Sequence, residues 1–140
     1  MADVMTALEV AQKKFKALQA RDNQGVLDCM DENVVLRVPG RRPLAGTYKG
    51  HAGIIDFTNR CRSVTDTGEH VEIVDMMSSD NRVAAIIKLG AEHGGHKLDD
   101  PTVHVMKVEN GKITEYWVYP WDVYAVDEFW IKAAQESSVS

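Results

Sequence analysis

The sequence predicts an α+β domain in which helices come first and an antiparallel sheet follows. Three segments with helical periodicity lie in the first part of the chain, up to about residue 62. From residue 70 to 120 apolar and polar residues alternate, which is typical of strands with one buried face. Within that part, Asn110-Gly111 is a strong hairpin signal, because a type I′ turn needs a positive φ at both central positions. Helices that precede an antiparallel sheet are expected to pack on one of its faces.

Length and composition fit a single domain. The chain has 140 residues, of which 44% are hydrophobic and 26% charged, as in ordinary soluble globular proteins. Its net charge of −5 argues against binding to nucleic acid or to an anionic membrane, since both require a basic patch. No apolar run approaches the roughly 18 residues that a membrane span needs.

The N-terminus and the cysteines indicate a cytoplasmic protein. The opening MADVMTALEV is acidic where a signal peptide is basic, and it contains no apolar core segment. In that setting Cys29 and Cys61 are expected to be reduced thiols.

Three helices are expected before the main sheet. The first runs from Asp3 to Ala20. Its apolar stripe consists of Val4, Leu8, Ala11, Phe15 and Leu18, and the lysines predicted to lie off that stripe are Lys13, Lys14 and Lys16. A short second helix follows Asp22, its candidate N-cap. The third is expected over residues 51–62.

The strands and the loops between them follow from β-branched runs and turn residues. Residues 33–38 predict a strand that ends at Pro39-Gly40, and residues 40–50 predict an irregular loop without a phosphate-loop pattern. Two strands are expected over 70–77 and 82–92, before the hairpin of residues 102–122. A terminal helix is expected over 122–134, so the domain spans residues 1–134 and residues 135–140 form a disordered tail.

The hairpin at Asn110-Gly111 carries the candidate chemistry. Regular pairing from this turn places His104 opposite Trp117 and Met106 opposite Glu115. One face then consists of Thr102, His104, Met106, Val108, Ile113, Glu115, Trp117 and Tyr119, and the other of Val103, Val105, Lys107, Thr114, Tyr116 and Val118. A register shift of one residue would exchange the faces of a whole strand.

The order of elements resembles the nuclear-transport-factor-2-like superfamily. Within it, the stretches VPGRRPLAGTYKGHAGIIDF, VHVMKVENGKI and YPWDVYAVDEFW resemble the SnoaL-like polyketide-cyclase and ketosteroid-isomerase-related families. The resemblance covers roughly residues 5–131. It implies a cone-shaped, curved sheet around a pocket that the helices close, with no cofactor. It also implies a homodimer through the outer sheet face, with Val103, Val105, Tyr116 and Val118 as the candidate surface.

The resemblance also assigns candidate catalytic residues. His104 falls where ketosteroid isomerases hold a pocket acid that hydrogen-bonds the substrate oxygen, and Asp122 falls near the acid/base aspartate of SnoaL-type cyclases. Two alternatives remain open, since a strand histidine is often a core residue and an aspartate before a helix is a good N-cap. Arg37 stands where similar sequences often have histidine. It stays charged, so a role there would be anion or carbonyl binding.

The candidate substrate-binding residues are mostly aromatic. They are Arg37, Tyr48, Met106, Trp117, Tyr119 and Trp121. Flat rings with polar tips suit a cyclic or aromatic ligand, although Trp117 and Tyr119 are equally expected as plain core residues. His93 and His96 flank a glycine turn without a third ligand nearby, so no metal site is predicted.

Together these features predict a cofactor-independent acid/base enzyme of cyclase or isomerase type. Its substrate would be a small hydrophobic carbonyl or polyketide-like compound, with His104 polarising the carbonyl oxygen and Asp122 moving a proton. The alternative is a non-catalytic ligand-binding or dimerisation module of the same fold. Epoxide hydrolysis would need an Asp-Arg-Asp constellation, which the predicted pocket face does not supply.

Overall fold

The computed structural model describes residues 5–66 and 68–137. In chain order the elements are α1 (Ala7–Gln19), α2 (Asn23–Asp28), β1 (Met30–Val38), β2 (Gly46–Lys49), α3 (Gly50–Val64), β3 (His70–Ser78), β4 (Arg82–His93), β5 (His96–Glu109), β6 (Lys112–Pro120) and α4 (Val123–Ser137). This confirms the α+β class. No helix among the described residues has the length and apolar character needed to cross a membrane.

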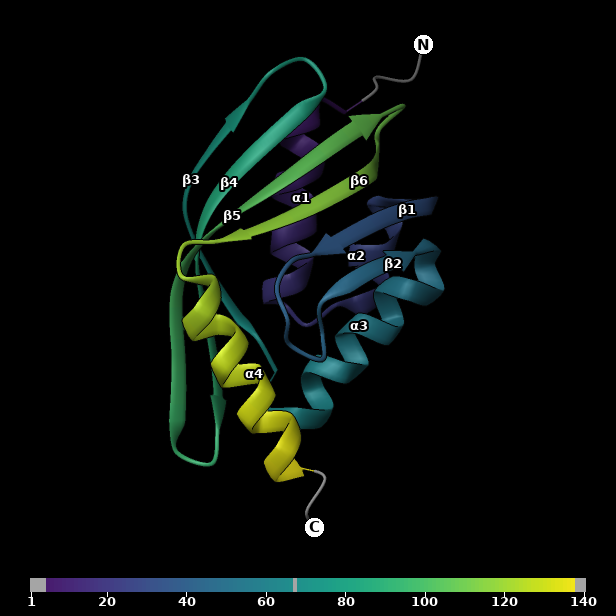
Figure 1. Ribbon diagram of the computed structural model, residues 1–140. Helices are drawn as coiled ribbons and strands as arrows, with labels where there is room; N and C mark the ends of the chain where they lie inside the picture. The colour runs from purple at the N-terminus through teal and green to yellow at the C-terminus, as the bar shows by residue number, and fades with distance from the viewer. Residues whose placement is uncertain (1–4, 67, 138–140) are drawn as a thin grey trace.

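One curved sheet forms the body of the cone. Its strand order is β2-β1-β6-β5-β4-β3, with β1 parallel to β6 and every other pair antiparallel. The sheet curves around α1, and the long β4–β5 hairpin extends beyond the other strands to lie beside α4 (Figure 1). The strand β2 was not expected: residues 46–49 were predicted to be loop, but they pair with the end of β1.

Helix α1 begins at a capping box, later than predicted. The Thr6 side chain accepts a hydrogen bond from the Glu9 backbone N–H at 3.2 Å, and the Glu9 carboxylate accepts one from the Thr6 N–H at 3.1 Å. This reciprocal pair satisfies two donors that the first turn leaves free. Asp3 and Val4, which the sequence placed in this helix, lie outside the described residues.

The core fills the space between α1 and the concave face of the sheet. Val10, Ala11 and Phe15 of α1 are fully buried there against Ile87, Met106 and Ile113. A smaller apolar cluster lies under α4 and includes Leu44, Cys61, Val126 and Trp130. Both cysteines are buried free thiols.

A β-bulge changes the predicted register of the β5–β6 hairpin. The turn itself is as predicted, with positive φ at Asn110 and Gly111 and with Val108 opposite Ile113. The next pair is Lys107 with Glu115, so Thr114 is an extra residue in β6. From there on, every β6 side chain points to the face opposite to the one expected.

The shifted register corrects the predicted faces. Met106 lies opposite Tyr116, and His104 lies opposite Val118. Tyr116 and Val118 therefore turn into the core, where both are buried. Trp117 and Tyr119 turn to the outer face, and Tyr119 is 53% exposed.

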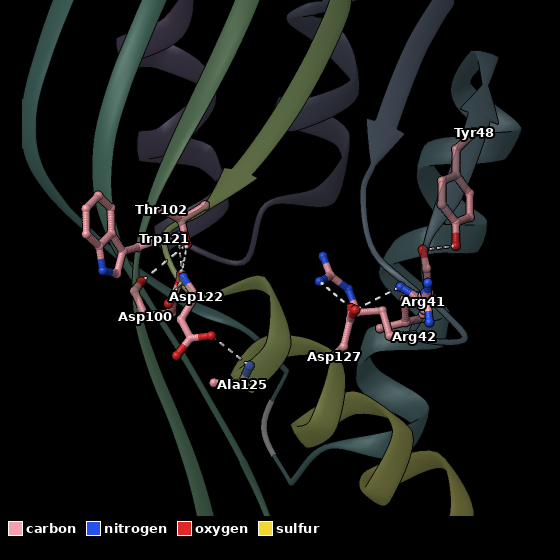
Figure 2. A network of polar contacts seen from close by, with 10 residues as sticks. Arg41, Arg42, Tyr48, Asp100, Thr102, Trp121, Asp122, Ala125 and Asp127 are labelled. Atoms are coloured by element: carbon pink, nitrogen blue, oxygen red, sulfur yellow. Dashed lines mark hydrogen bonds and ion pairs between the residues drawn. The ribbon is translucent and has the colours of Figure 1, made fainter.

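Helix α4 is fixed to the end of β6 by a buried aspartate. The Asp100 side chain is 3% exposed and accepts hydrogen bonds from the Thr102 hydroxyl at 3.0 Å and from the Trp121 and Asp122 backbone N–H groups at 3.1 Å (Figure 2). Its two oxygens thus hold the corner between β6 and α4. The helix continues to Ser137, so residues 135–137 are helical where the sequence predicted a disordered tail. Residues 138–140 lie outside the described residues.

The hydrogen bonds of Asp100 lead to a first prediction. In Asp100→Asn, one carboxylate oxygen becomes an NH₂ donor that faces backbone N–H donors. We expect this change to lower the free energy of unfolding by about 1–3 kcal/mol. Urea denaturation measures it, with Asp99→Asn at the exposed neighbouring position as the matched control. Equal stability of the two variants would contradict this role of Asp100.

Candidate functional site

A cavity of about 120 Å³ lies between the helices and the concave face of the sheet. Its walls are mainly apolar and include Leu18, Val26, Ile54, Phe57 and Val118. The ionisable side chains that line it include Lys14, Arg42, Glu69, His104 and Tyr116, with the exposed Arg21 and Arg62 at its edge. A space of this size is of the order that holds one aromatic ring.

Three of these side chains form a buried hydrogen-bonded chain. Lys14 Nζ donates to Tyr116 Oη at 2.8 Å, and Tyr116 Oη forms a hydrogen bond with His104 Nδ1. The Phe15 ring stacks on His104 with 5.9 Å between centroids, and Lys14 Nζ lies 4.2 Å from the centre of the Phe15 ring. Because an amine or ammonium donates to Tyr116, the Tyr116 hydroxyl proton is directed to Nδ1, and His104 carries its own proton on Nε2.

Burial sets the protonation of this chain. Loss of hydration lowers the pKa of Lys14 from 10.5 to about 7, against a smaller opposing effect from Glu69. Burial, and then the positive charge of Lys14, hold the pKa of His104 well below its usual value. Burial also raises the pKa of Tyr116 well above its usual value. Near neutral pH the tyrosine and the histidine are therefore neutral, and Lys14 is the member that gains and loses a proton.

Arg42 and Glu69 are two further charged residues of the cavity lining. Arg42 is only 6% exposed, and its Nη1 lies 3.4 Å from Asp127 Oδ1. Its Nε is buried without a hydrogen-bond partner among the described residues. Glu69 accepts a hydrogen bond from the Cys61 thiol at 3.3 Å, and burial raises the pKa of Glu69.

The structure brings one of the two predicted catalytic residues to the cavity. His104 lines it, whereas Asp122 is exposed and caps α4: its Oδ1 accepts a hydrogen bond from the Ala125 N–H at 3.0 Å (Figure 2). The alternative left open for Asp122, an N-cap, is what the geometry shows. The chain continues through Pro120 and Trp121 before α4 begins, which carries Asp122 out of the cone.

The predicted substrate-binding residues lie outside the cavity lining. Met106 is fully buried core, and the Tyr48 hydroxyl is used in a 2.7 Å hydrogen bond to the Leu44 carbonyl. Trp121 is 84% exposed. Arg37 pairs with Glu115 at 3.1 Å and packs over Trp117. The bulge at Thr114 thus places Trp117 and Tyr119 on the outer face of the sheet, and Arg37 lies on the same face of the neighbouring β1, between the buried Leu36 and Val38.

Sequence reasoning missed Lys14, Tyr116, Arg42 and Glu69. A signal for Lys14 was present, since it follows Val10 by four residues and Ala11 by three and precedes Leu18 by four. Lys14 therefore lies on the apolar stripe of α1, not off it as predicted. Tyr116 was assigned to the wrong face by the missed bulge. Arg42 and Glu69 lie outside the helices and strands, where periodicity gives no information about burial.

No group of three or more metal-ligating His, Cys, Asp or Glu side chains occurs in the part of the chain that the structure describes. His93, one of the two histidines at the glycine turn, pairs instead with Glu136 of α4 at 2.8 Å.

The buried Lys14 makes a second prediction, on stability. Its pKa is lower in the folded protein than in the unfolded chain, so the folded state binds fewer protons between about pH 7 and 10.5. The contribution of Lys14 to the free energy of unfolding therefore rises with pH across that range, by up to about 1.4 kcal/mol per pH unit. Lys14→Met should exceed the wild type in free energy of unfolding by the largest amount at pH 7 and below. This difference between the two proteins should shrink toward pH 10. Urea denaturation of both proteins at several pH values measures it; a pH-independent difference would contradict the burial effect.

Comparison with known proteins identifies the family. Residues 11–116 match the SnoaL-like domain. An uncharacterized protein of Mycobacterium tuberculosis is 27% identical over 124 residues, which cover 88% of this chain and 95% of that protein. The structure of Bal32a, from a soil-derived mobile gene cassette, is similar with a TM-score of 0.84 and 30% identity over 89% of this chain and 95% of that one. The structure of TerC, co-crystallized with polyporic acid, is similar with a TM-score of 0.81 and 23% identity over 90% of this chain and 98% of that one. The chain belongs to the SnoaL-like family of the nuclear-transport-factor-2-like superfamily.

Proposed function

We propose that this protein is a cofactor-independent enzyme of cyclase or isomerase type, in which Lys14 acts as the acid/base group on a small carbonyl compound. The observation that carries the proposal is the position of Lys14: its amino group is buried at the cavity, hydrogen-bonded to Tyr116, and has a pKa of about 7. A general base works best when its pKa is near the working pH. Perturbed groups of this kind in a cavity are typical of active sites.

The proposed chemistry is proton removal beside a carbonyl group. The neutral Lys14 amine takes a proton from the carbon next to the carbonyl, and the C–H electron pair moves into an enolate. The Nε2–H of His104 donates to the enolate oxygen. With a β,γ-unsaturated ketone, the enolate is a dienolate, and return of the proton from Lys14 to the γ-carbon gives the conjugated isomer. With a second carbonyl in the substrate, the enolate carbon attacks that carbonyl carbon and closes a ring, and the resulting alkoxide oxygen takes the proton back from Lys14. No metal is needed, because a base and an oxyanion donor suffice.

Tyr116 has a positioning role in this scheme. Its hydroxyl links Lys14 Nζ to His104 Nδ1 and so holds the base and the oxyanion donor at a fixed separation. Since burial keeps the pKa of Tyr116 high, the phenol stays protonated and the histidine tautomer stays fixed. In this proposal Lys14 replaces Asp122 as the base, and His104 keeps its predicted role.

Support for a small-molecule ligand also comes from the similar structures. TerC, which shares this fold, was co-crystallized with polyporic acid. A non-catalytic ligand-binding module would show the same fold and an occupied cavity, so only a measurement of chemistry separates the two functions.

The third prediction tests the base. Cyclohexanone, a small neutral ketone, is incubated with the protein in D₂O, and deuteration beside the carbonyl is followed by NMR. The rate should rise through about pH 7 as Lys14 loses its proton, and Lys14→Met should lower it by about 100-fold or more. Asp122→Ala is the control: it should lose about 1 kcal/mol of stability as a lost N-cap and keep the wild-type rate.

Two results would contradict the proposed enzyme. If Lys14→Met exchanges as fast as the wild type, Lys14 is not the base. If cyclohexanone binds in the cavity without any protein-dependent deuteration between pH 6 and 9, the ligand-binding module becomes the better function.

We also propose a homodimer through the outer face of the sheet. The inward turn of Tyr116 and Val118 changes the candidate surface, which now combines Val103 and Val105 with Trp117 and Tyr119. The guanidinium carbons of Arg37 and Arg82 lie 5.5 and 5.6 Å from the centre of the Trp117 ring, so both arginines lie beside this surface. Aromatic residues and arginines are the types enriched at protein interfaces.

We further propose a cytoplasmic location, where the buried free thiols would stay reduced.

Sedimentation velocity gives the fourth prediction. The wild type should sediment at twice the chain mass, and Val105→Glu should sediment as a monomer, because it places a charge in the middle of the apolar face. Gln12→Glu, at an exposed position of α1 and away from the outer face of the sheet, is the control for one added negative charge. A wild-type monomer at all concentrations would refute the dimer.

A further inference from the structure

The second cationic group of the cavity, Arg42, has an unused donor. Its side chain lines the cavity and is 4% exposed, and its Nε–H has neither solvent nor a protein partner among the described residues. Leaving a buried donor of a charged group unpaired costs free energy. Such a group is therefore explained most simply by a partner that arrives with the ligand.

The loop that carries Arg42 is fixed to α4, and this holds the guanidinium in place. Asp127 accepts a 2.9 Å hydrogen bond from the Arg41 backbone N–H through one oxygen, and its other oxygen lies 3.4 Å from Arg42 Nη1 (Figure 2). Gly40, with φ of 104°, allows this approach, because a Cβ there would lie 2.2 Å from the Asp127 carboxylate. The contact to Asp127 uses Nη1. Nε belongs to the opposite edge of the guanidinium, which it forms together with Nη2 and which pairs with carboxylates through two parallel hydrogen bonds.

The charges around the cavity favour an anion. Arg42 is always positive and Lys14 is partly so near neutral pH, while Arg21 and Arg62 add positive charge at the edge. The acidic side chain that lines the cavity is Glu69. Burial disfavours its charged form, so Glu69 and the Asp127 carboxylate that pairs with Arg42 only partly offset the cations.

We propose that the ligand is a small cyclic carboxylate, whose carboxylate binds Arg42 while its ring lies against the apolar wall of the cavity. Phe57 and Val118 belong to that wall, and Lys14 and His104 line the same cavity. This rests on the proposed function, because it names the substrate class of the same cavity. An arginine edge matches the planar carboxylate geometry better than a lysine does. The 120 Å³ volume limits the class to compounds with about one ring.

The fifth prediction compares two ligands of the same shape. Benzoate and benzamide differ by an anionic oxygen and an NH₂ group, and NMR titration gives the dissociation constant of each. We expect the wild type to bind benzoate at least about tenfold more tightly than benzamide. Equal binding of the two would overturn the inference without any variant.

Variants then locate the anion. Arg42→Gln should weaken benzoate binding about tenfold and leave benzamide unchanged, whereas Arg41→Gln, which removes the same charge from an exposed neighbour, should change neither by more than about twofold. Glu69→Gln should tighten benzoate binding, since it removes the competing negative charge. If Arg42→Gln does not fold, the Glu69→Gln result and the comparison of the two ligands still decide. Loss of benzoate preference in Lys14→Met but not in Arg42→Gln would also overturn the inference.

Failure of this inference and failure of the proposed function are distinguishable. Cyclohexanone has no carboxylate, so Lys14-dependent deuteration with equal binding of benzoate and benzamide would refute the carboxylate site alone. Arg42-dependent binding of benzoate without any deuteration of cyclohexanone would leave the carboxylate site standing and remove the support for acid/base chemistry.

Discussion

The bulge at Thr114 decides which side chains of β6 face the cavity. Without the extra residue, Trp117 and Tyr119 would point inward, and Tyr116 would lie on the outer face. With it, Tyr116 meets Lys14 from α1 and His104 from β5, three residues that are far apart in the sequence. The Thr114 hydroxyl lies 3.4 Å from the Lys107 carbonyl on the neighbouring strand, close to the point where the pairing shifts. Bulges commonly redirect side chains next to functional sites.

The buried chain of Lys14, Tyr116 and His104 includes a group that destabilises the folded state. A lysine amino group in an apolar interior destabilises the folded state whenever it is charged, and its lowered pKa is the measure of that cost. Two aromatic rings lie close to the Lys14 Nζ atom, at 4.2 and 4.6 Å from their centres, and offset part of it. Methionine or leucine would pack at this position without such a cost. A group retained against stability is typical of functional sites.

Much of the fold was predictable, because it depends on periodicity and on local turn chemistry. The helix at residues 50–64, the strands from 70 onward and the turn at Asn110-Gly111 follow from patterns that residues impose on their own neighbours. The bulge was not predictable in this way, since no residue type in Lys112 to Glu115 requires it. That single missed residue moved Trp117 and Tyr119 to the wrong face. Asp122 was misassigned for another reason: an N-cap and a pocket acid use the same side chain, and only the geometry of the corner at Asp100 separates them.

The most direct test of this account is the titration of Lys14 itself. NMR of the protein with ¹³C-labelled lysine, recorded across a pH titration, would give the midpoint pH at which the Lys14 amino group loses its proton. The Lys14 signal is assigned as the one that is missing from the spectrum of Lys14→Met. We predict a midpoint near pH 7 for Lys14. A Lys14 midpoint near 10 would show that its amino group is hydrated, and would remove the basis for its role as the acid/base group.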